Sequence, residues 1–303
     1  MSARRTFSAL FLVLLLSPPL GATETRLTTV DAANTHPTWS WAQSYIAYQT
    51  DRQYPGTNIR YMSDPRRWDA PVTTHASRNY ARPCWAQSGD LAFDGDNDAG
   101  HDRVWRILPG TPYASELSDP ASGDDGAPHY RDGSGFVLHS SRSGDDEICW
   151  MSTSGEVGGF SELTDNASAD RYPCWSPDGN WIAFASDRSG NWDIWIMSAA
   201  GESDSVRQLT TDPADESGPD WSPTGEFLAF HREGSGIVAI DVASRTEHQV
   251  TADPTDAWPS WSGDGGRIAF ARGTGVSHIW MTDNVPASSI EASSWGRLKA
   301  LFR

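Results

Sequence analysis

Aromatic and apolar residues recur along the chain at a nearly constant interval. The clearest mark of each unit is an aromatic residue two positions after a proline, found at Trp39, Trp85, Tyr130, Trp175, Trp221 and Trp261. Successive anchors lie 46, 45, 45, 46 and 40 residues apart. A period of roughly 40–45 residues is typical of one four-stranded propeller blade. The spacing therefore predicts six blades.

Each unit contains four segments with the residue pattern of strands. One begins at the proline and anchor, and a second carries a small or apolar residue followed by an aromatic residue or histidine, with His139 expected to replace the aromatic residue in the third unit. A third segment has a β-branched residue in all six units, namely Ile59, Val104, Ile148, Ile194, Ile237 and Ile279. Such residues suit a strand packed on both faces. A fourth segment is marked by a leucine or valine 11 to 13 residues before each anchor.

Turn sequences such as Ser-Pro-Asp-Gly at residues 176–179 separate these segments, and no stretch has a convincing helical pattern. We therefore predict an all-β protein, a six-bladed β-propeller of four-stranded antiparallel blades.

The order of the segments predicts how the ring closes. The mark of the fourth strand at Leu27 comes before the first anchor, so residues 26–28 are expected to complete the blade whose other three strands come last. This interlock pairs a sheet edge that would otherwise invite aggregation. The tail at residues 295–299 is the alternative closing strand, but the spacing of Leu27 from Trp39 equals that of Leu209 from Trp221 and favours the N-terminal segment.

The first 22 residues have the pattern of a secretory signal peptide. Arg4 and Arg5 precede an apolar run at residues 7–16, which is shorter than the roughly 20 residues that span a bilayer. Small and helix-breaking residues follow, so cleavage is expected after Ala22. The paired arginines fit both the general secretory and the twin-arginine export route. We expect residues 23–303 to form a single propeller domain that is periplasmic or secreted.

The charge of the chain limits the classes of partner that it can bind, and its cysteine content bears on disulfides. The 303-residue chain has 40 Asp and Glu against 23 Lys and Arg, a formal net charge of −17. Nucleic acids and anionic membrane surfaces are recognised by clustered Lys and Arg, so this charge argues against both. The three cysteines show no metal-ligand spacing. Because export implies an oxidising environment, two interpretations stay open: buried thiols, or a disulfide between Cys149 and Cys174.

The fourth and fifth units resemble the repeat of the TolB-type β-propeller family. The similarity rests on residues 172–197, which read YPCWSPDGNWIAFASDRSGNWDIWIM, and on RQLTTDP at residues 207–213. It extends over the chain after residue 22 and is weakest in the third unit, where Tyr130 replaces the anchor tryptophan. The resemblance implies six blades and a periplasmic location, and in that family the propeller docks a peptidoglycan-associated lipoprotein, whereas for this chain it implies a propeller-only relative with an unknown partner. TolB itself also carries an α/β domain ahead of its propeller, and we expect no room for one between Ala22 and Leu27.

Enzymatic motifs are not evident. The same repeat precedes the hydrolase domain of prolyl-oligopeptidase-like peptidases, but we find neither such a domain nor a Gly-x-Ser-x-Gly elbow nor a zinc-binding His-Glu-x-x-His sequence. The alternative is a carbohydrate-binding or metal-dependent polysaccharide-lyase-like propeller, similar to the oligogalacturonate lyases with their histidine ligands around a divalent metal. Only His36 and His75 lie in the relevant loops. We therefore expect a non-catalytic, protein-binding scaffold.

The candidate site is the ring of loops that link each outer strand to the next inner strand, because these loops surround one mouth of the central channel. Three residues before each anchor proline stand Asn34, Tyr80, Asp125, Asp170, Glu216 and Asp256. Immediately before each proline stand His36, Arg82, Ala127, Tyr172, Gly218 and Trp258.

Two roles are open for the acidic ring. Its carboxylates can accept hydrogen bonds from nearby backbone N–H groups, or they can attract a basic partner or a hard cation such as Ca²⁺. The residues predicted to bind a partner are Asn34, His36, Arg82, Asp125, Asp170, Tyr172, Glu216, Asp256 and Trp258. Among them, His36, Arg82, Tyr172 and Trp258 are the candidates for specific contacts, because aromatic side chains and arginine supply most binding energy at interfaces. We expect an envelope or secreted protein or peptide as the partner, a monomeric protein without a transmembrane anchor, and no cofactor other than a Ca²⁺ in or near the channel.

Overall fold

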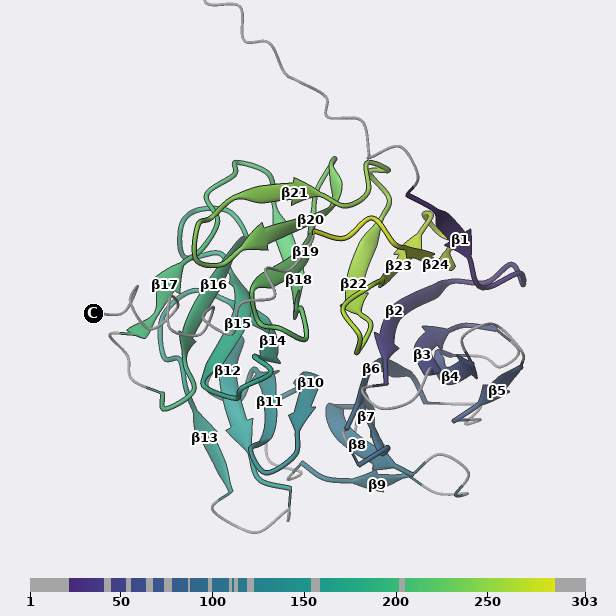
Figure 1. The fold of residues 1–303 in the computed structure, drawn as a ribbon. Helices are drawn as coiled ribbons and strands as arrows, with labels where there is room; N and C mark the ends of the chain where they lie inside the picture. The colour runs from purple at the N-terminus through teal and green to yellow at the C-terminus, as the bar shows by residue number, and fades with distance from the viewer. Residues whose placement is uncertain are drawn as a thin grey trace, which may run out of the picture.

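The computed structural model describes residues 22–40, 45–52, 56–63, 68–73, 78–86, 88–97, 100–108, 111, 114–118, 123–153, 159–201 and 205–286. These residues form six four-stranded antiparallel sheets around a central axis, which confirms the six-bladed propeller (Figure 1). The expected signal peptide, apart from Ala22, lies outside the described residues, as do His75 and the tail at residues 295–299. Within the described ranges, no helix has the length and apolar character needed to span a bilayer.

The strands of each blade follow one another from the axis outward. Blade 1 consists of β2 (Asn34–Trp39), β3 (Tyr45–Thr50), β4 (Asn58–Ser63) and β5 (Asp69–Pro71), and blade 2 of β6 (Tyr80–Trp85), β7 (Leu91–Asp96), β8 (Asp102–Ile107) and β9 (Ser115–Glu116). Blade 3 consists of β10 (Asp125–Arg131), β11 (Gly135–Ser140), β12 (Glu147–Met151) and β13 (Phe160–Glu162), and blade 4 of β14 (Asp170–Trp175), β15 (Trp181–Ser186), β16 (Asp193–Ser198) and β17 (Arg207–Gln208). Blade 5 consists of β18 (Glu216–Trp221), β19 (Phe227–Arg232), β20 (Gly236–Asp241) and β21 (Glu247–Gln249), and blade 6 of β22 (Ala257–Trp261), β23 (Ile268–Arg272), β24 (His278–Thr282) and β1 (Glu24–Arg26).

The N-terminal strand closes the ring, as predicted. Strand β1 pairs antiparallel with β24, so that Thr25 lies opposite Met281 (Figure 1). Just beyond β1, the backbone N–H of Leu27 donates to the carbonyl oxygen of Ile279 at 2.7 Å, and the Leu27 side chain is buried. The first and last parts of the propeller thus share one sheet.

The core lies between the blades. The anchors Trp39, Trp85, Trp175, Trp221 and Trp261 are all buried, and the largest apolar cluster joins residues of blades 4 and 5, including Trp181 and Trp221. A buried tryptophan removes a large apolar area from water, so these repeated rings stabilise the contact between neighbouring blades. All three cysteines are buried free thiols, and the disulfide between Cys149 and Cys174 is not formed.

The second strand of blade 3 corrects one sequence expectation. In blade 4, Phe184 pairs with Trp195 and Ala185 with Ile194. In blade 3, it is His139 that pairs with the β-branched Ile148, so His139 is equivalent to Ala185 rather than to an aromatic residue. The expected replacement was wrong because His139 follows its anchor Tyr130 by nine residues, whereas the equivalent Ala185 follows its anchor Trp175 by ten. A slip of one residue along a strand moves a side chain to the opposite face of the sheet.

Candidate functional site

A β-bulge interrupts the inner strand of every blade at the residue before the anchor proline. The pairing register shifts at this point in all six sheets, for example between Thr35 and Thr38 in β2. The bulged residues have positive φ angles, 50° at His36, 46° at Arg82, 46° at Ala127, 55° at Tyr172, 61° at Gly218 and 58° at Trp258. Side chains other than glycine disfavour this region. Bulges re-aim side chains and gather near functional sites.

The six bulged residues surround one mouth of the channel. Together with the prolines and the residues that follow them, they line a cavity of about 120 Å³. The structure therefore brings together the four residues predicted as specific contacts, His36, Arg82, Tyr172 and Trp258, in one cavity.

An aromatic group covers one half of this mouth. The imidazole of His36 stacks on the indole of Trp258 with ring centroids 4.0 Å apart, and the ring of Tyr172 meets the same indole edge-on at 5.0 Å. Tyr172 belongs to blade 4 and Trp258 to blade 6, and the bulged residue between them is Gly218. A Cβ atom at Gly218 would lie 2.9 Å from Cε3 of Trp258. The absent side chain thus leaves the space in which Trp258 reaches across blade 5.

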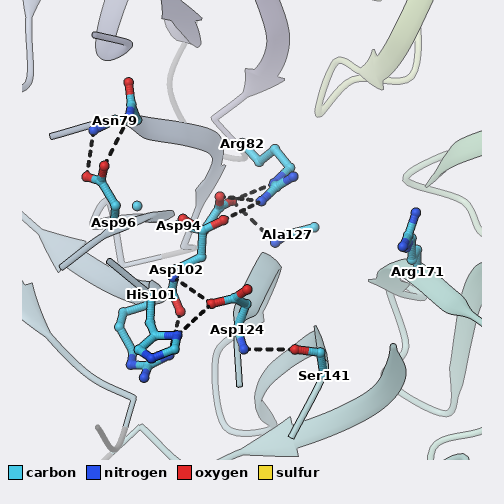
Figure 2. A network of polar contacts seen from close by, with 12 residues as sticks. Asn79, Arg82, Asp94, Asp96, His101, Asp102, Asp124, Ala127, Ser141 and Arg171 are labelled. Atoms are coloured by element: carbon cyan, nitrogen blue, oxygen red, sulfur yellow. Dashed lines mark hydrogen bonds and ion pairs between the residues drawn. The ribbon is translucent and has the colours of Figure 1, made fainter. Parts of the chain in front are cut away.

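The other half of the mouth is polar and less filled. Arg82 donates from Nε and Nη2 to the carboxylate of Asp94 on β7, at 2.7 and 2.5 Å, and the backbone N–H of Ala127 donates to the same carboxylate at 3.3 Å (Figure 2). Burial works to lower the pKa of Arg82, but the neighbouring Asp94 raises it overall. Burial also raises the pKa of Asp94, against the opposing effect of Arg82. The guanidinium is therefore held in place at the edge of the cavity.

Two histidines near the mouth are uncharged. Burial, and then the charge of Arg82, lower the pKa of His36 to about 3. Burial and the charges of Arg82 and Arg171 lower the pKa of His139 to about 3 as well. The ring of His139 contacts Tyr172 at 5.7 Å, and its Nδ1 atom has no hydrogen-bond partner among the residues that the structure describes. At neutral pH the positive charge around this half of the mouth therefore comes from arginine.

The predicted acidic ring lies one layer beneath the surface. Asp125, Asp170, Glu216 and Asp256 are each 0% exposed, and Asn34 is also buried. The four carboxylates pair with arginines of their own blades, at Asp125–Arg142 2.5 Å, Asp170–Arg188 2.5 Å, Glu216–Arg232 2.7 Å and Asp256–Arg272 2.5 Å. The side-chain amide of Asn34 donates to the backbone carbonyl oxygen of Ser277 at 2.9 Å. This geometry favours the structural role of the ring, because a partner could reach these carboxylates only by displacing an arginine.

The sequence did not reveal these arginines, because they come from two different positions. Arg142 and Arg188 lie two residues after the ends of β11 and β15, whereas Arg232 and Arg272 are the last residues of β19 and β23. Burial raises the pKa of Glu216 to about 7, against the hydrogen bond from Thr210 and the charge of Arg232. The signal that could have found the pairs is an arginine near the end of the second strand in each of these four blades.

A second ring of side chains, just below the mouth, was also missed. The residue after the anchor proline accepts a hydrogen bond from the backbone N–H of the anchor in the next blade. These contacts are Tyr130 N to Cys84 Sγ 3.2 Å, Trp175 N to His129 Nδ1 3.1 Å, Trp261 N to Asp220 Oδ2 2.7 Å and Trp39 N to Ser260 Oγ 3.1 Å. The last of them crosses the closure between blades 6 and 1. These contacts join four of the six pairs of neighbouring blades.

A metal site requires several ligating side chains close together. Within the described ranges, no group of three or more His, Cys, Asp or Glu side chains is placed to hold a metal ion. The Ca²⁺ expected in or near the channel stays a prediction.

Comparison with solved structures places this architecture among known propellers. Over 82% of this chain and 65% of the other, it superposes on TolB from Acinetobacter baumannii with a TM-score of 0.67 and 19% identity. The putative TolB from Agrobacterium tumefaciens gives a TM-score of 0.66 and 17% identity over 86% of this chain and 96% of that one. An oligogalacturonate lyase in complex with manganese gives a TM-score of 0.58 and 15% identity over 88% of this chain and 80% of that one. At these identities the likeness shows the fold alone.

Family comparison is more specific. A search of curated proteins found no match. The model of the TolB beta propeller domain matches residues 111–289, which is more than half of the chain. Together with the six closed blades and their anchor repeat, this match shows that the chain belongs to the TolB β-propeller family.

Proposed function

We propose that the protein is a non-catalytic scaffold that binds another protein of the cell envelope at the mouth of its channel. The observation that supports the proposal is a contrast between two sets of positions. The anchors and the buried strand positions carry similar residues in every blade, whereas the six bulged positions carry six different ones. A scaffold needs repetition, but a recognition site needs a particular arrangement of side chains.

The mouth has the composition of an interaction hot spot. Its aromatic half offers the rings of His36, Tyr172 and Trp258, already packed against one another, and its polar half offers Arg82, already oriented by Asp94. Side chains that are fixed before binding lose little conformational entropy when a partner arrives. Aromatic residues and arginine in such settings supply most of the binding energy of protein interfaces.

The envelope location and the monomeric state belong to the same proposal. The N-terminal pattern expected of a signal peptide and the membership of the TolB β-propeller family support an exported protein. The formal charge of −17 supports a protein partner over nucleic acid.

Affinity capture tests the proposal. The processed protein is immobilised, exposed to an envelope extract of its own organism, and the bound proteins are identified by mass spectrometry. A specific partner is expected with the wild-type protein and is expected to be lost with Trp258→Ala. Trp68→Ala is the matched control, because Trp68 is a 40% exposed tryptophan outside the channel mouth. A partner retained by Trp258→Ala, or lost equally with Trp68→Ala, would contradict the assignment of the mouth.

A carbohydrate-active propeller is the second candidate. His36 and His129 both line this mouth, and the ring of His139 contacts Tyr172, which lines it as well. The fold likeness to an oligogalacturonate lyase points the same way. Incubation with uronate oligosaccharides and divalent metal, followed by absorbance of unsaturated product, separates the two candidates. Product formation above a heat-treated control would favour the lyase.

A further inference from the structure

The bulged ring carries only a methyl group at Ala127, between Arg82 and Tyr172. We call the part of the mouth cavity lined by Arg82, Ala127 and Tyr172 the Ala127 gap. Resting on the proposed function, we propose that the protein partner inserts a carboxylate into the Ala127 gap, where the free end of the Arg82 guanidinium receives it. The carboxylate is that of an Asp or Glu side chain or of the partner's C-terminus.

The gap lies where the bulged side chain is small, and Nη2 of Arg82 reaches over blade 3 to within 3.0 Å of the Cβ position of Gly126. Trp258 lies over Gly218 and contacts both His36 and Tyr172, so the sector over blades 4, 5, 6 and 1 is already occupied. In blade 3 the bulged side chain is only a methyl group, between Arg82 of blade 2 and Tyr172 of blade 4. An inserted group would therefore have the aromatic rings on one side and the guanidinium on the other.

Arg82 still has hydrogen-bond donors to offer. A guanidinium carries five N–H donors, and Asp94 accepts one from Nε and one from Nη2. Among the described residues, no hydrogen bond is made to Nη1 of Arg82, and the nearest further carboxylate oxygen, in Asp102, lies 3.9 Å from Nη2. The Nη1 and Nη2 end is a planar fork whose geometry matches the two oxygens of a carboxylate.

A second guanidinium strengthens the choice of an anion. Arg171 lies on the other side of the gap from Arg82 (Figure 2), and the charges of both lower the pKa of His139 between them. Arg171 donates from Nε to Asp146 at 2.5 Å and its side chain is 41% exposed. Both guanidinium groups already pair with carboxylates, Asp94 and Asp146, so an incoming carboxylate would be selected by the N–H donors that these contacts leave free.

Binding of a carboxylate costs little conformational entropy because the Arg82 side chain is already fixed. The bidentate contact with Asp94 holds Arg82, and the N–H of Ala127 holds Asp94 from the next blade. Blades 2 and 3 thus meet at this carboxylate, and the fork keeps its direction in the absence of a partner.

Paired peptides test the inference. The probes are acetyl-Phe-Gly with a free C-terminal carboxylate and the same peptide with a C-terminal amide, titrated at millimolar concentrations into the full processed protein and followed by NMR chemical shifts. The free acid is expected to bind at least about tenfold more tightly than the amide, the difference given by one hydrogen bond to a charged donor.

Variants test whether the preference for the acid depends on Arg82 and on the Ala127 gap. Arg82→Lys keeps a positive charge beside Asp94 but removes the planar fork, and Ala127→Leu fills the gap while leaving the Arg82–Asp94 pair in place. Both are expected to reduce the preference to less than about twofold. Arg106→Lys is the matched control, since Arg106 pairs with Asp90 away from the mouth, and is expected to leave the preference unchanged. Loss of the preference only in Arg106→Lys, or its retention in both mouth variants, would overturn the inference.

Three further results would overturn it and remain distinguishable from a failure of the proposed function. Equal binding of acid and amide that Trp258→Ala abolishes would leave the mouth as a peptide site without a carboxylate subsite. If neither peptide binds while affinity capture still depends on Trp258, the mouth would remain the site of the partner protein, but without a carboxylate subsite. Binding of trigalacturonate to the gap in place of both peptides would assign the guanidinium to a sugar acid and would contradict the protein partner as well.

Discussion

Trp258 lies directly over Gly218, and a single Cβ atom at Gly218 would sit 2.9 Å from its indole. The two residues occupy equivalent bulged positions in neighbouring blades, so a feature of one blade sets the side-chain position in the next. Because Gly218 has no side chain, Trp258 contacts Tyr172 two blades away. The shape of the mouth thus depends on one glycine as much as on the aromatic residues.

Gly218→Ala is expected to destabilise the protein and to displace Trp258. The residue has a φ of 61°, where alanine is strained by about 1 kcal/mol, and the new methyl group would collide with the indole. The free energy of unfolding in urea measures the first effect, and partner capture or peptide binding measures the second.

Gly133→Ala is the control for backbone strain. Gly133 has a φ of 77°, but a Cβ atom there would meet nothing within 4 Å. A similar loss of stability with unchanged binding is expected. Equal binding losses in both variants would show that displacement of Trp258 is not the cause.

The ion pair between Asp170 and Arg188 should behave as part of the scaffold. Asp170 is 0% exposed, and Arg188 also packs over the ring of Trp195. Removing one partner of a buried pair costs about 3–5 kcal/mol, because the other charge is left unpaired. We expect Asp170→Ala to lose about 3 kcal/mol of unfolding free energy, measured by urea denaturation, and to keep partner binding wherever the protein is folded.

A double-mutant cycle separates the pair from its surroundings. The combination of Asp170→Ala and Arg188→Ala should lose less than the sum of the two single changes by at least about 1 kcal/mol. Asp31→Ala is the surface control, since Asp31 is 82% exposed and 3.9 Å from Arg26, and should change stability by less than about 0.5 kcal/mol. If Asp170→Ala instead left stability intact and abolished binding, the acidic ring would be a contact surface.

Repetition made the fold predictable from the sequence. Each blade buries the same kinds of residues, so the anchor tryptophans and the β-branched third strand reveal their partners through spacing alone. The closing strand was predictable too, because Leu27 repeats the spacing of Leu209. Such local patterns carry the architecture because a blade packs mainly on its neighbours.

The sequence did not predict in the same way which site residues are buried and which line the mouth. Asp170 and Tyr172 are two residues apart, yet the first is buried against Arg188 and the second lines the mouth. A β-bulge before the proline separates their directions, and its effect on each side chain depends on tertiary contacts that spacing does not encode. His139 was misplaced for a related reason, since one residue fewer between the anchor and the second strand changes which side chain lies on a given face of the sheet.

The three thiols are expected to be inert in the folded protein. Cys84, Cys149 and Cys174 are buried and free, and burial raises the pKa of Cys84 to about 12 and that of the other two as well. The thiolate is the reactive form, so little of it exists at neutral pH. A thiol reagent such as DTNB should label none of the three in buffer and all three in denaturant. Rapid labelling of the native protein would contradict this burial.

Asp220 should make the stability of the propeller depend on pH. Its carboxylate lies in the channel and accepts the backbone N–H of Trp261 at 2.7 Å, and burial raises its pKa to about 7 despite the N–H bonds from Trp261 and Trp221. In the unfolded chain an aspartate titrates near its ordinary value, about 3.9. Between these two values the folded state binds the proton more tightly than the unfolded state, so this group favours folding at low pH and the benefit is lost as the pH rises through 7.

Comparison with Asp220→Asn isolates this effect. The asparagine keeps a side-chain oxygen for the N–H of Trp261 but does not titrate. The difference in unfolding free energy between wild type and variant, measured by urea denaturation from pH 4 to pH 8, should shift steadily in favour of the variant as the pH increases. Solvent in the channel cavity reduces the size of the shift, so on the order of 1–3 kcal/mol is expected over the whole range. If the difference stays constant with pH, the pKa of Asp220 lies near that of an exposed aspartate. Burial would then not raise the pKa of the carboxylate that accepts the N–H of Trp261 in the next blade.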